Sequence, residues 1–149
     1  MNLRDRITQD LKNAMKSGDK LRLETLRTVR AQMIELEKKG LDREITTDDE
    51  LSVLQSAVKK RKEAIEQYQQ AGRSDLANQE QAELEIIMSY LPKQMSTEEA
   101  EHIVAAIITQ TGASSAKDFG KVMPLVMKEL KGKIDGKLVQ ELVKRKLGL

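Results

Sequence analysis

The sequence has no cysteine, and it has few of the aromatic side chains that help to fill β-sheet cores. Its 149 residues contain no Trp, two Tyr and one Phe. Without cysteine there is no disulfide, no thiolate metal ligand and no cysteine nucleophile. The single histidine, His102, excludes multi-histidine zinc and iron sites. These absences exclude whole classes of metalloprotein and argue against an all-β sandwich or barrel.

Long apolar runs are missing as well. No stretch approaches the ~18 consecutive apolar residues that a transmembrane helix needs. The first residues form an amphipathic pattern and not the apolar core of a secretory signal. We therefore expect a cytoplasmic protein with no membrane partner.

The residues that are present favour helices. The chain is 39% hydrophobic and 34% charged, and its apolar residues are mostly aliphatic. Leu26, Val29, Met33 and Leu36 recur at spacings of three and four, which places them on one helix face. Glycines separate such stretches, as expected where helices end. The sequence predicts an all-α protein with helices over 2–17, 20–39, 48–71, 75–90, 97–111, 116–131 and 136–147.

Prolines and capping residues suggest the boundaries. Pro92 ends the fourth predicted helix, which predicts a four-helix N-terminal domain over 1–93 and a small three-helix domain over 94–149. Two Ser/Thr-x-x-Glu capping boxes are predicted, Thr47 with Glu50 and Ser96 with Glu99. Pro124 lies inside the sixth predicted helix, so that helix either kinks or begins anew with Pro124 in its first turn.

Two predicted helices carry charge on an apolar face. Arg61 lies at a position on the apolar face of the third predicted helix, and Glu80 lies at such a position in the fourth. A short turn joins these helices, so Arg61 is predicted to approach Glu80 or Glu83. Because an unpaired buried charge is costly, we expect an ion pair that fixes helix packing; an anion or carboxyl site is the alternative.

Basic residues concentrate at the end of the chain. Residues 121–149 carry eight Lys or Arg and three Asp or Glu, whereas residues 41–120 carry eight and fifteen. The basic segment is a candidate RNA-backbone surface, and charge that only keeps the protein in solution is the alternative. No aromatic residue lies among these lysines, so base stacking is not expected. The tract Lys59–Lys62 spreads around its helix and is interpreted as a solvated face, with a nucleic-acid contact as the alternative.

Catalytic signatures are missing. The sequence has no phosphate-binding glycine loop, no nucleophile elbow and no acid–base pair distinct from ordinary helix-surface charge. His102 is interpreted as a surface residue in the first turn of its helix. We expect no catalytic residue, no metal site and no cofactor, and interpret the chain as a binding module.

Several motifs together resemble one family. They are Ile-Glu-Gln-Tyr at 65–68, Ala-Gly-Arg at 71–73, Tyr-Leu-Pro at 90–92, Asp-Phe-Gly-Lys-Val-Met at 118–123 and Lys-Gly-Lys at 131–133. Through these motifs the sequence is similar to the YqeY proteins over nearly its whole length. The resemblance implies an N-terminal four-helix region and a smaller C-terminal three-helix region. The same module resembles the tail of GatB, a subunit of the glutamine-dependent amidotransferase that acts on misacylated tRNA.

The resemblance also implies a function. It suggests a freestanding tRNA-binding helper, associated with carbon–nitrogen ligase chemistry through an amidotransferase or aminoacyl-tRNA synthetase subunit and not catalytic alone. The alternative is a helical protein-interaction adaptor with no RNA role. The shared motifs point to one set of expected RNA contacts: Gly120, Lys121, Lys131, Gly132, Lys133, Gly136 and Lys137.

Overall fold

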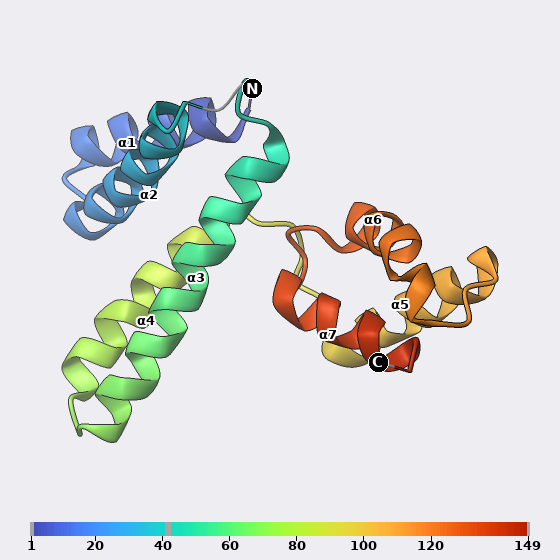
Figure 1. Cartoon of the computed structure of the whole chain (residues 1–149). Helices are drawn as coiled ribbons and strands as arrows, with labels where there is room; N and C mark the ends of the chain where they lie inside the picture. The colour runs from blue at the N-terminus through green and yellow to red at the C-terminus, as the bar shows by residue number, and fades with distance from the viewer. Residues whose placement is uncertain (1, 41–42, 149) are drawn as a thin grey trace. The chain divides into compact units, whose positions relative to one another are not determined.

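The computed structural model describes residues 2–40 and 43–148, and these confirm the all-α prediction (Figure 1). No strand occurs among them. The described residues form α1 (Leu3–Ser17), α2 (Lys20–Lys38), α3 (Thr47–Gln70), α4 (Ser74–Met88), α5 (Thr97–Thr111), the short 3-10 helix η1 (Ala116–Asp118), α6 (Phe119–Leu130) and α7 (Gly136–Lys146).

The chain divides into two compact units, each with its own core. Unit 1 is Met1–Leu91 and unit 2 is Pro92–Leu149. The domain boundary expected after residue 93 falls just beyond this division. Unit 1 contains α1 to α4, and unit 2 contains α5, η1, α6 and α7.

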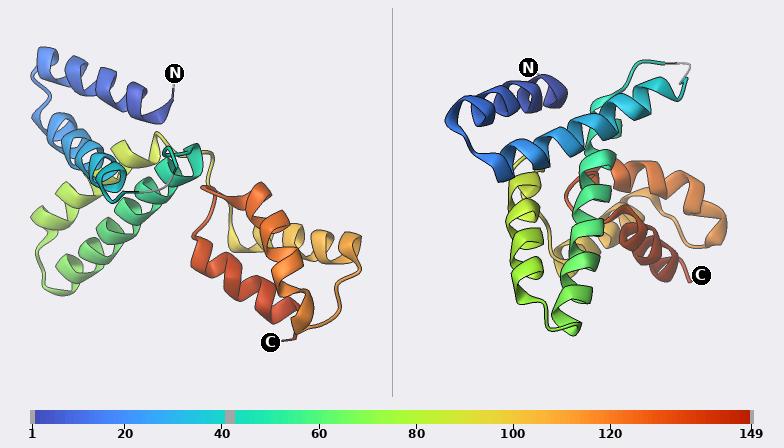
Figure 2. Two further views of the ribbon diagram at one scale, coloured as in Figure 1. Left: turned by 45° about the horizontal axis from the view of Figure 1, so that its top comes forward. Right: turned by 90° about the vertical axis from the view of Figure 1, so that its left-hand side faces the viewer.

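Unit 1 consists of two helical hairpins. Figure 2 shows α1 beside α2 and α3 beside α4, each pair joined by a tight turn. Gly18 ends α1 with a φ of 75°, a left-handed conformation that glycine adopts without steric cost. The apolar faces of the four helices meet in one core, whose buried residues are Ile7, Leu26, Val29, Met33, Leu54, Ala57, Ile87 and Tyr90.

Tyr90 ties the end of the second hairpin to the first. Its hydroxyl donates to Asp10 Oδ2 at 2.5 Å and accepts from Arg22 Nη2 at 3.3 Å. The Arg6 guanidinium lies 4.8 Å from the centre of the ring. Burial, together with the hydrogen bond to Asp10, raises the pKa of Tyr90 to about 12. The residue just before the inter-unit connector is therefore held by both α1 and α2.

The capping box predicted at Thr47 and Glu50 is wrong by one residue. The N-cap of α3 is Thr46, whose hydroxyl accepts from the Asp49 N–H at 3.2 Å while Asp49 accepts from the Thr46 N–H at 2.8 Å. Glu50 is instead 2% exposed. At the other predicted box, Ser96 does cap α5 and accepts from the Glu99 N–H.

Unit 2 packs three helices around an aliphatic core. Its fully buried members include Val104 of α5, Val122 and Val126 of α6, and Leu142 of α7. The prediction of one helix over 116–131 is wrong at its start, because η1 precedes α6. Pro124 lies inside α6 and not in its first turn, so the second of the two alternatives for this proline is wrong.

Candidate nucleic-acid interface

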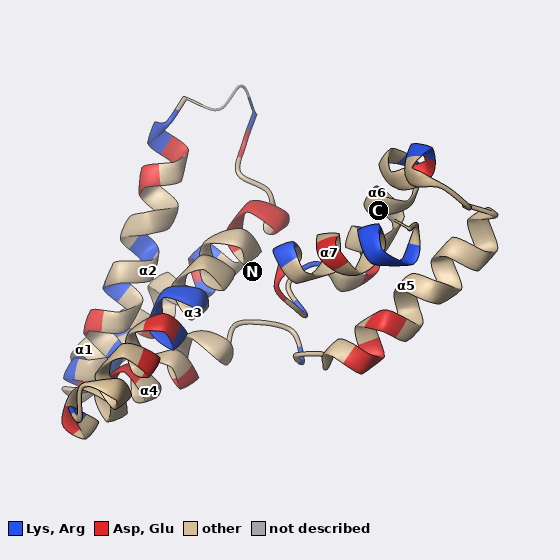
Figure 3. Cartoon of the chain, turned by 60° about the horizontal axis from the view of Figure 1, so that its bottom comes forward, with Lys and Arg blue, Asp and Glu red and all other residues tan. Residues whose placement is uncertain are grey.

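The residues predicted to contact RNA lie in two groups within unit 2. The first group is the turn between α6 and α7 with the start of α7. The turn contains Lys131, Gly132 and Lys133, and α7 begins with Gly136 and Lys137. Lys137 is exposed, whereas Lys131 and Lys133 are half-buried. Figure 3 shows basic positions, in blue, at both ends of α7.

The local sequence explains the shape of this turn. The chain leaves α6 after Leu130, and Gly132 takes a φ of 81°, which a residue with a Cβ avoids. The Lys133 N–H then donates to the Leu130 carbonyl at 3.0 Å. Asp135 caps α7 by accepting from the Lys137 N–H at 3.2 Å. The turn thus places three lysines within a few residues of one another.

The backbone of this turn is occupied by contacts within unit 2. Gln94 Nε2 donates to the Gly132 carbonyl at 2.9 Å, and the Met95 N–H donates to the Lys133 carbonyl at 2.8 Å. Gly132 is also buried. The turn at Gly132 therefore holds the segment before α5 through its backbone carbonyls, and an RNA contact at Gly132 stays a prediction.

The second group lies where α6 begins. Gly120 and Lys121 are exposed in its first turn, and a Cβ added at Gly120 meets nothing within 4 Å. Gly120 is therefore open to a ligand. The Lys144 ammonium lies 5.8 Å from the centre of the Phe119 ring, so the end of α7 lies beside the start of α6.

Sequence reasoning left the end of α7 out of the expected contact residues. Lys144, Arg145 and Lys146 form its last turn, and all three are exposed. They belong to the basic segment 121–149, but cations in a last helical turn also stabilise the helix itself, so they were not singled out as contacts. The contact between Lys144 and Phe119 places Lys144 beside the Gly120–Lys121 group.

A carboxylate lies close to this second group. Asp118 accepts the N–H groups of Ser114 and Ser115 at 2.9 and 3.3 Å. These hydrogen bonds, with a smaller contribution from Lys121, lower the pKa of Asp118. Asp118 thus stays ionised and offsets part of the charge of Lys121.

The two groups lie at opposite ends of α6. A helix of twelve residues is about 18 Å long. Because the sites are separated by that length, a single phosphate does not bridge them. An extended polyanion such as a nucleic-acid backbone spans such a distance, and the two groups therefore suit a ligand with several phosphates.

The predicted ion-pair residues lie in unit 1. Arg61 Nε is 3.9 Å from Glu83 Oε2, and Arg61 Nη1 donates to the Ala57 carbonyl at 3.2 Å. The Arg61 side chain is 11% exposed. Burial and the neighbouring charge of Glu80 raise the pKa of Glu83, and Arg61 opposes that rise. Arg61 therefore pairs with Glu83 of α4, an arrangement suited to holding α3 against α4.

The described residues contain no candidate metal-binding site. No group of three or more His, Cys, Asp or Glu side chains among them is arranged to hold a metal ion. His102 is exposed on α5. No helix within the described ranges is long and apolar enough to cross a membrane.

Fold and surface together define an all-α protein with a basic three-helix unit, and comparison with known proteins gives the family. Residues 4–147 match the family model described as Yqey-like protein. The chain belongs to this family, which confirms the resemblance seen in the motifs.

Relatives extend the comparison. The chain is 34% identical to "Altered inheritance of mitochondria protein 41, mitochondrial" of Pyrenophora tritici-repentis, over 96% of this chain and 80% of the relative. It is 38% identical to an uncharacterized protein of Schizosaccharomyces pombe, over 64% of this chain and 76% of the relative. It is 28% identical to a glutamyl-tRNA(Gln) amidotransferase subunit of Methanococcus maripaludis, over 80% of this chain and 20% of that relative. The chain is thus related to the amidotransferase module.

One prediction is contradicted by these relatives. A cytoplasmic location was expected from the sequence, but the Pyrenophora relative is named as mitochondrial, and the same name recurs in further relatives. An amphipathic first stretch does not separate the cytoplasm from an organelle.

Proposed function

We propose that this chain is a tRNA-binding helper related to glutamine-dependent tRNA amidotransferases, and that unit 2 makes the contact. The observation that carries the proposal is the placement of basic residues at both ends of the α6–α7 pair. The name of the Methanococcus relative, an amidotransferase subunit for glutamyl-tRNA, supports tRNA as the polyanion.

The contact is with the sugar–phosphate backbone and not with bases. Lysine ammonium groups neutralise phosphates without reading sequence. Stacking on bases needs exposed aromatic rings, and Phe119 of unit 2 is half-buried with Lys144 over its ring. The chain therefore adds affinity for tRNA, and another protein of the complex supplies selectivity and the carbon–nitrogen ligase chemistry.

Charge reversal at each end of the interface tests the proposal. The full chain is titrated against a fluorescein-labelled tRNA(Gln) transcript, with binding followed by fluorescence anisotropy. The variants are K131E/K133E at the turn and K121E/K146E at the other end. Each removes two cations and adds two anions, so each is expected to weaken binding about tenfold or more at moderate salt.

A matched control lies in unit 1. Lys59 and Lys62 are exposed on α3, and K59E/K62E makes the same change in net charge. This variant is expected to change the affinity less than threefold, and circular dichroism reports whether each variant is folded. Equal binding by all the variants, or an equal loss in the control, would show that the interface is elsewhere.

A further inference from the structure

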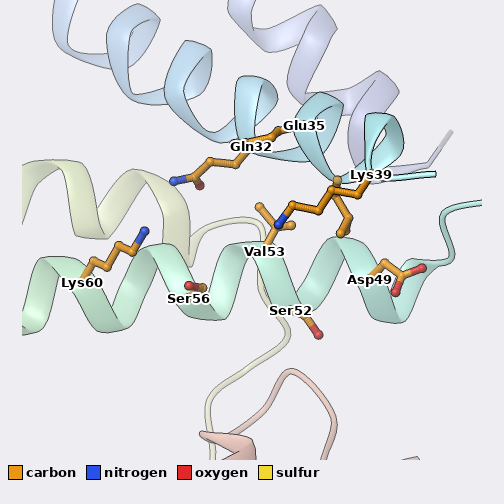
Figure 4. Close-up of a pocket in the computed structure, with 9 residues that line it drawn as sticks. Gln32, Glu35, Lys39, Asp49, Ser52, Val53, Ser56 and Lys60 are labelled. Atoms are coloured by element: carbon orange, nitrogen blue, oxygen red, sulfur yellow. The ribbon is translucent and has the colours of Figure 1, made fainter. Parts of the chain in front are cut away.

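Unit 1 contains a groove that the proposed tRNA contact does not use. It lies between the second half of α2 and the first half of α3 and has a volume of about 370 Å³ (Figure 4). Its α3 side is lined by Val53, Ser56 and Lys60, which follow one another at spacings of three and four and so share a face. From Val53 to Lys60 this face extends about 10 Å.

Three nitrogen-bearing side chains reach into the groove. Figure 4 shows Gln32 of α2 and Lys39, the residue after α2, extending toward α3, and Lys60 extending from α3 toward α2. Within the described ranges, neither Lys39 nor Lys60 takes part in an ion pair. Both ammonium groups are therefore available to a ligand.

The floor between the cations is partly apolar. Leu36 and Val53 line it, and both are half-buried while still contributing to the groove surface. The Ser56 hydroxyl lies between Val53 and Lys60 on α3 (Figure 4). An occupant of this groove therefore has an apolar side chain to bury as well as negative charge to neutralise.

The two carboxylates of the lining are not equivalent. Asp49 is held by Arg43, with Oδ1 3.0 Å from Nη2, and by the N-cap of α3, so its pKa lies well below its usual range. It points toward the outer end of the groove (Figure 4). Glu35 is the remaining carboxylate of the lining and has no ion pair among the described residues. The inner groove thus presents two cations against one anion.

We infer that this groove binds an acidic peptide segment of a partner protein, with carboxylates that pair with Lys39 and Lys60 and an apolar side chain on Leu36 and Val53. A phosphate chain has no use for the apolar floor, and no aromatic side chain lines the groove for base stacking. A peptide with two carboxylates and an apolar side chain between them complements both the cations and the floor.

Titration of the full chain with a designed peptide tests this inference. The probe is a fluorescein-labelled peptide with two glutamates separated by leucines. We expect saturable binding, with amide and methyl NMR shifts confined to the groove residues. K39A/K60A is expected to weaken binding about tenfold, and E35Q to strengthen it about twofold because it removes a like charge.

Neighbouring residues supply the control. Lys38 and Lys59 are each one position away, are exposed and do not line the groove. K38A/K59A removes the same charge and is expected to leave the affinity within a factor of two. Equal binding by K39A/K60A and this control, equal binding of a peptide with Lys in place of Glu, or no saturable binding would overturn the inference. Loss of tRNA binding in K39A/K60A but not in K38A/K59A would assign the groove to RNA instead.

Discussion

At the residue scale, Glu50 shows how one carboxylate joins two helices of unit 1. Its Oε2 accepts the backbone N–H of Arg4 at 2.8 Å and lies 3.8 Å from Arg4 Nε. Arg4 is in the first turn of α1, where backbone N–H groups lack partners within the helix. A carboxylate is favourable there because it satisfies a donor and complements the helix dipole. Arg4 also pairs with Glu37 of α2.

Removal of this carboxylate is expected to destabilise the protein. Glu50→Ala leaves the Arg4 N–H and part of its guanidinium buried without that acceptor, and we expect a loss of about 2–3 kcal/mol in the free energy of unfolding. Urea denaturation followed by circular dichroism measures the loss. Glu63→Ala, at an exposed position of the same helix, is the control. A change as small as that of the control would contradict the role of Glu50.

Glu83 is expected to give the stability of the folded protein an unusual pH dependence. Its pKa in the folded protein is raised above its ordinary value of 4.5, chiefly by burial. The folded state therefore holds this proton more tightly than the unfolded state. Its contribution to stability is present below pH 4.5 and is lost as the pH rises through the raised pKa.

Glu83→Gln removes this titration. We expect the free energy of unfolding of the wild type, minus that of the variant, to fall between pH 4 and pH 7. Denaturant titrations at several pH values give this difference, with the exposed Glu85→Gln as the control. A difference that rises with pH would mean that the ion pair with Arg61 outweighs the cost of burying the carboxylate.

At the element scale, periodicity located the helices well. The stripe Leu26, Val29 and Met33 is buried as predicted, because regular spacing reports directly which face meets the core. The start of α6 was missed because Asp118 binds the N–H groups of Ser114 and Ser115, a local contact that has no periodic signal. Glu50 was misassigned because sequence spacing does not show that a carboxylate faces another helix.

The candidate interface was only partly predictable. Clustering of basic residues in the sequence indicated unit 2, since charge composition needs no coordinates. Three features depend on the folded structure and not on composition. Lys121 and Lys131 are separated by the length of α6, Lys144 lies beside the start of α6, and Gly132 is buried.

Two glycines of the predicted interface are expected to behave in opposite ways. Gly132→Ala forces a residue with a Cβ into a φ of 81° and is expected to destabilise the protein by about 1–2 kcal/mol. Gly120→Ala places a Cβ in open space on a helix and is expected to stabilise it by about 0.5–1 kcal/mol. Urea denaturation tests both. Equal effects of the two substitutions would show that the Gly132 turn is not the constraint described.

At the scale of the whole molecule, the formal net charge is close to zero, but the charges are unevenly distributed along the chain. The formal net charge of the chain is +2, yet residues 121–149 alone carry eight cations and three anions. A polyanion held by such a surface releases counterions, so its affinity depends on salt. Unit 1 has a groove of its own between α2 and α3, so the two units present different surfaces.

The salt dependence of tRNA binding tests the central claim most directly. Plotting the logarithm of the association constant against that of the salt concentration gives a slope that counts the phosphates neutralised. We predict a steep slope for the full chain, reduced by about one in each of K121A, K133A and K137A. A shallow slope for the full chain, or a slope and affinity unchanged in all three variants, would contradict a phosphate contact by unit 2.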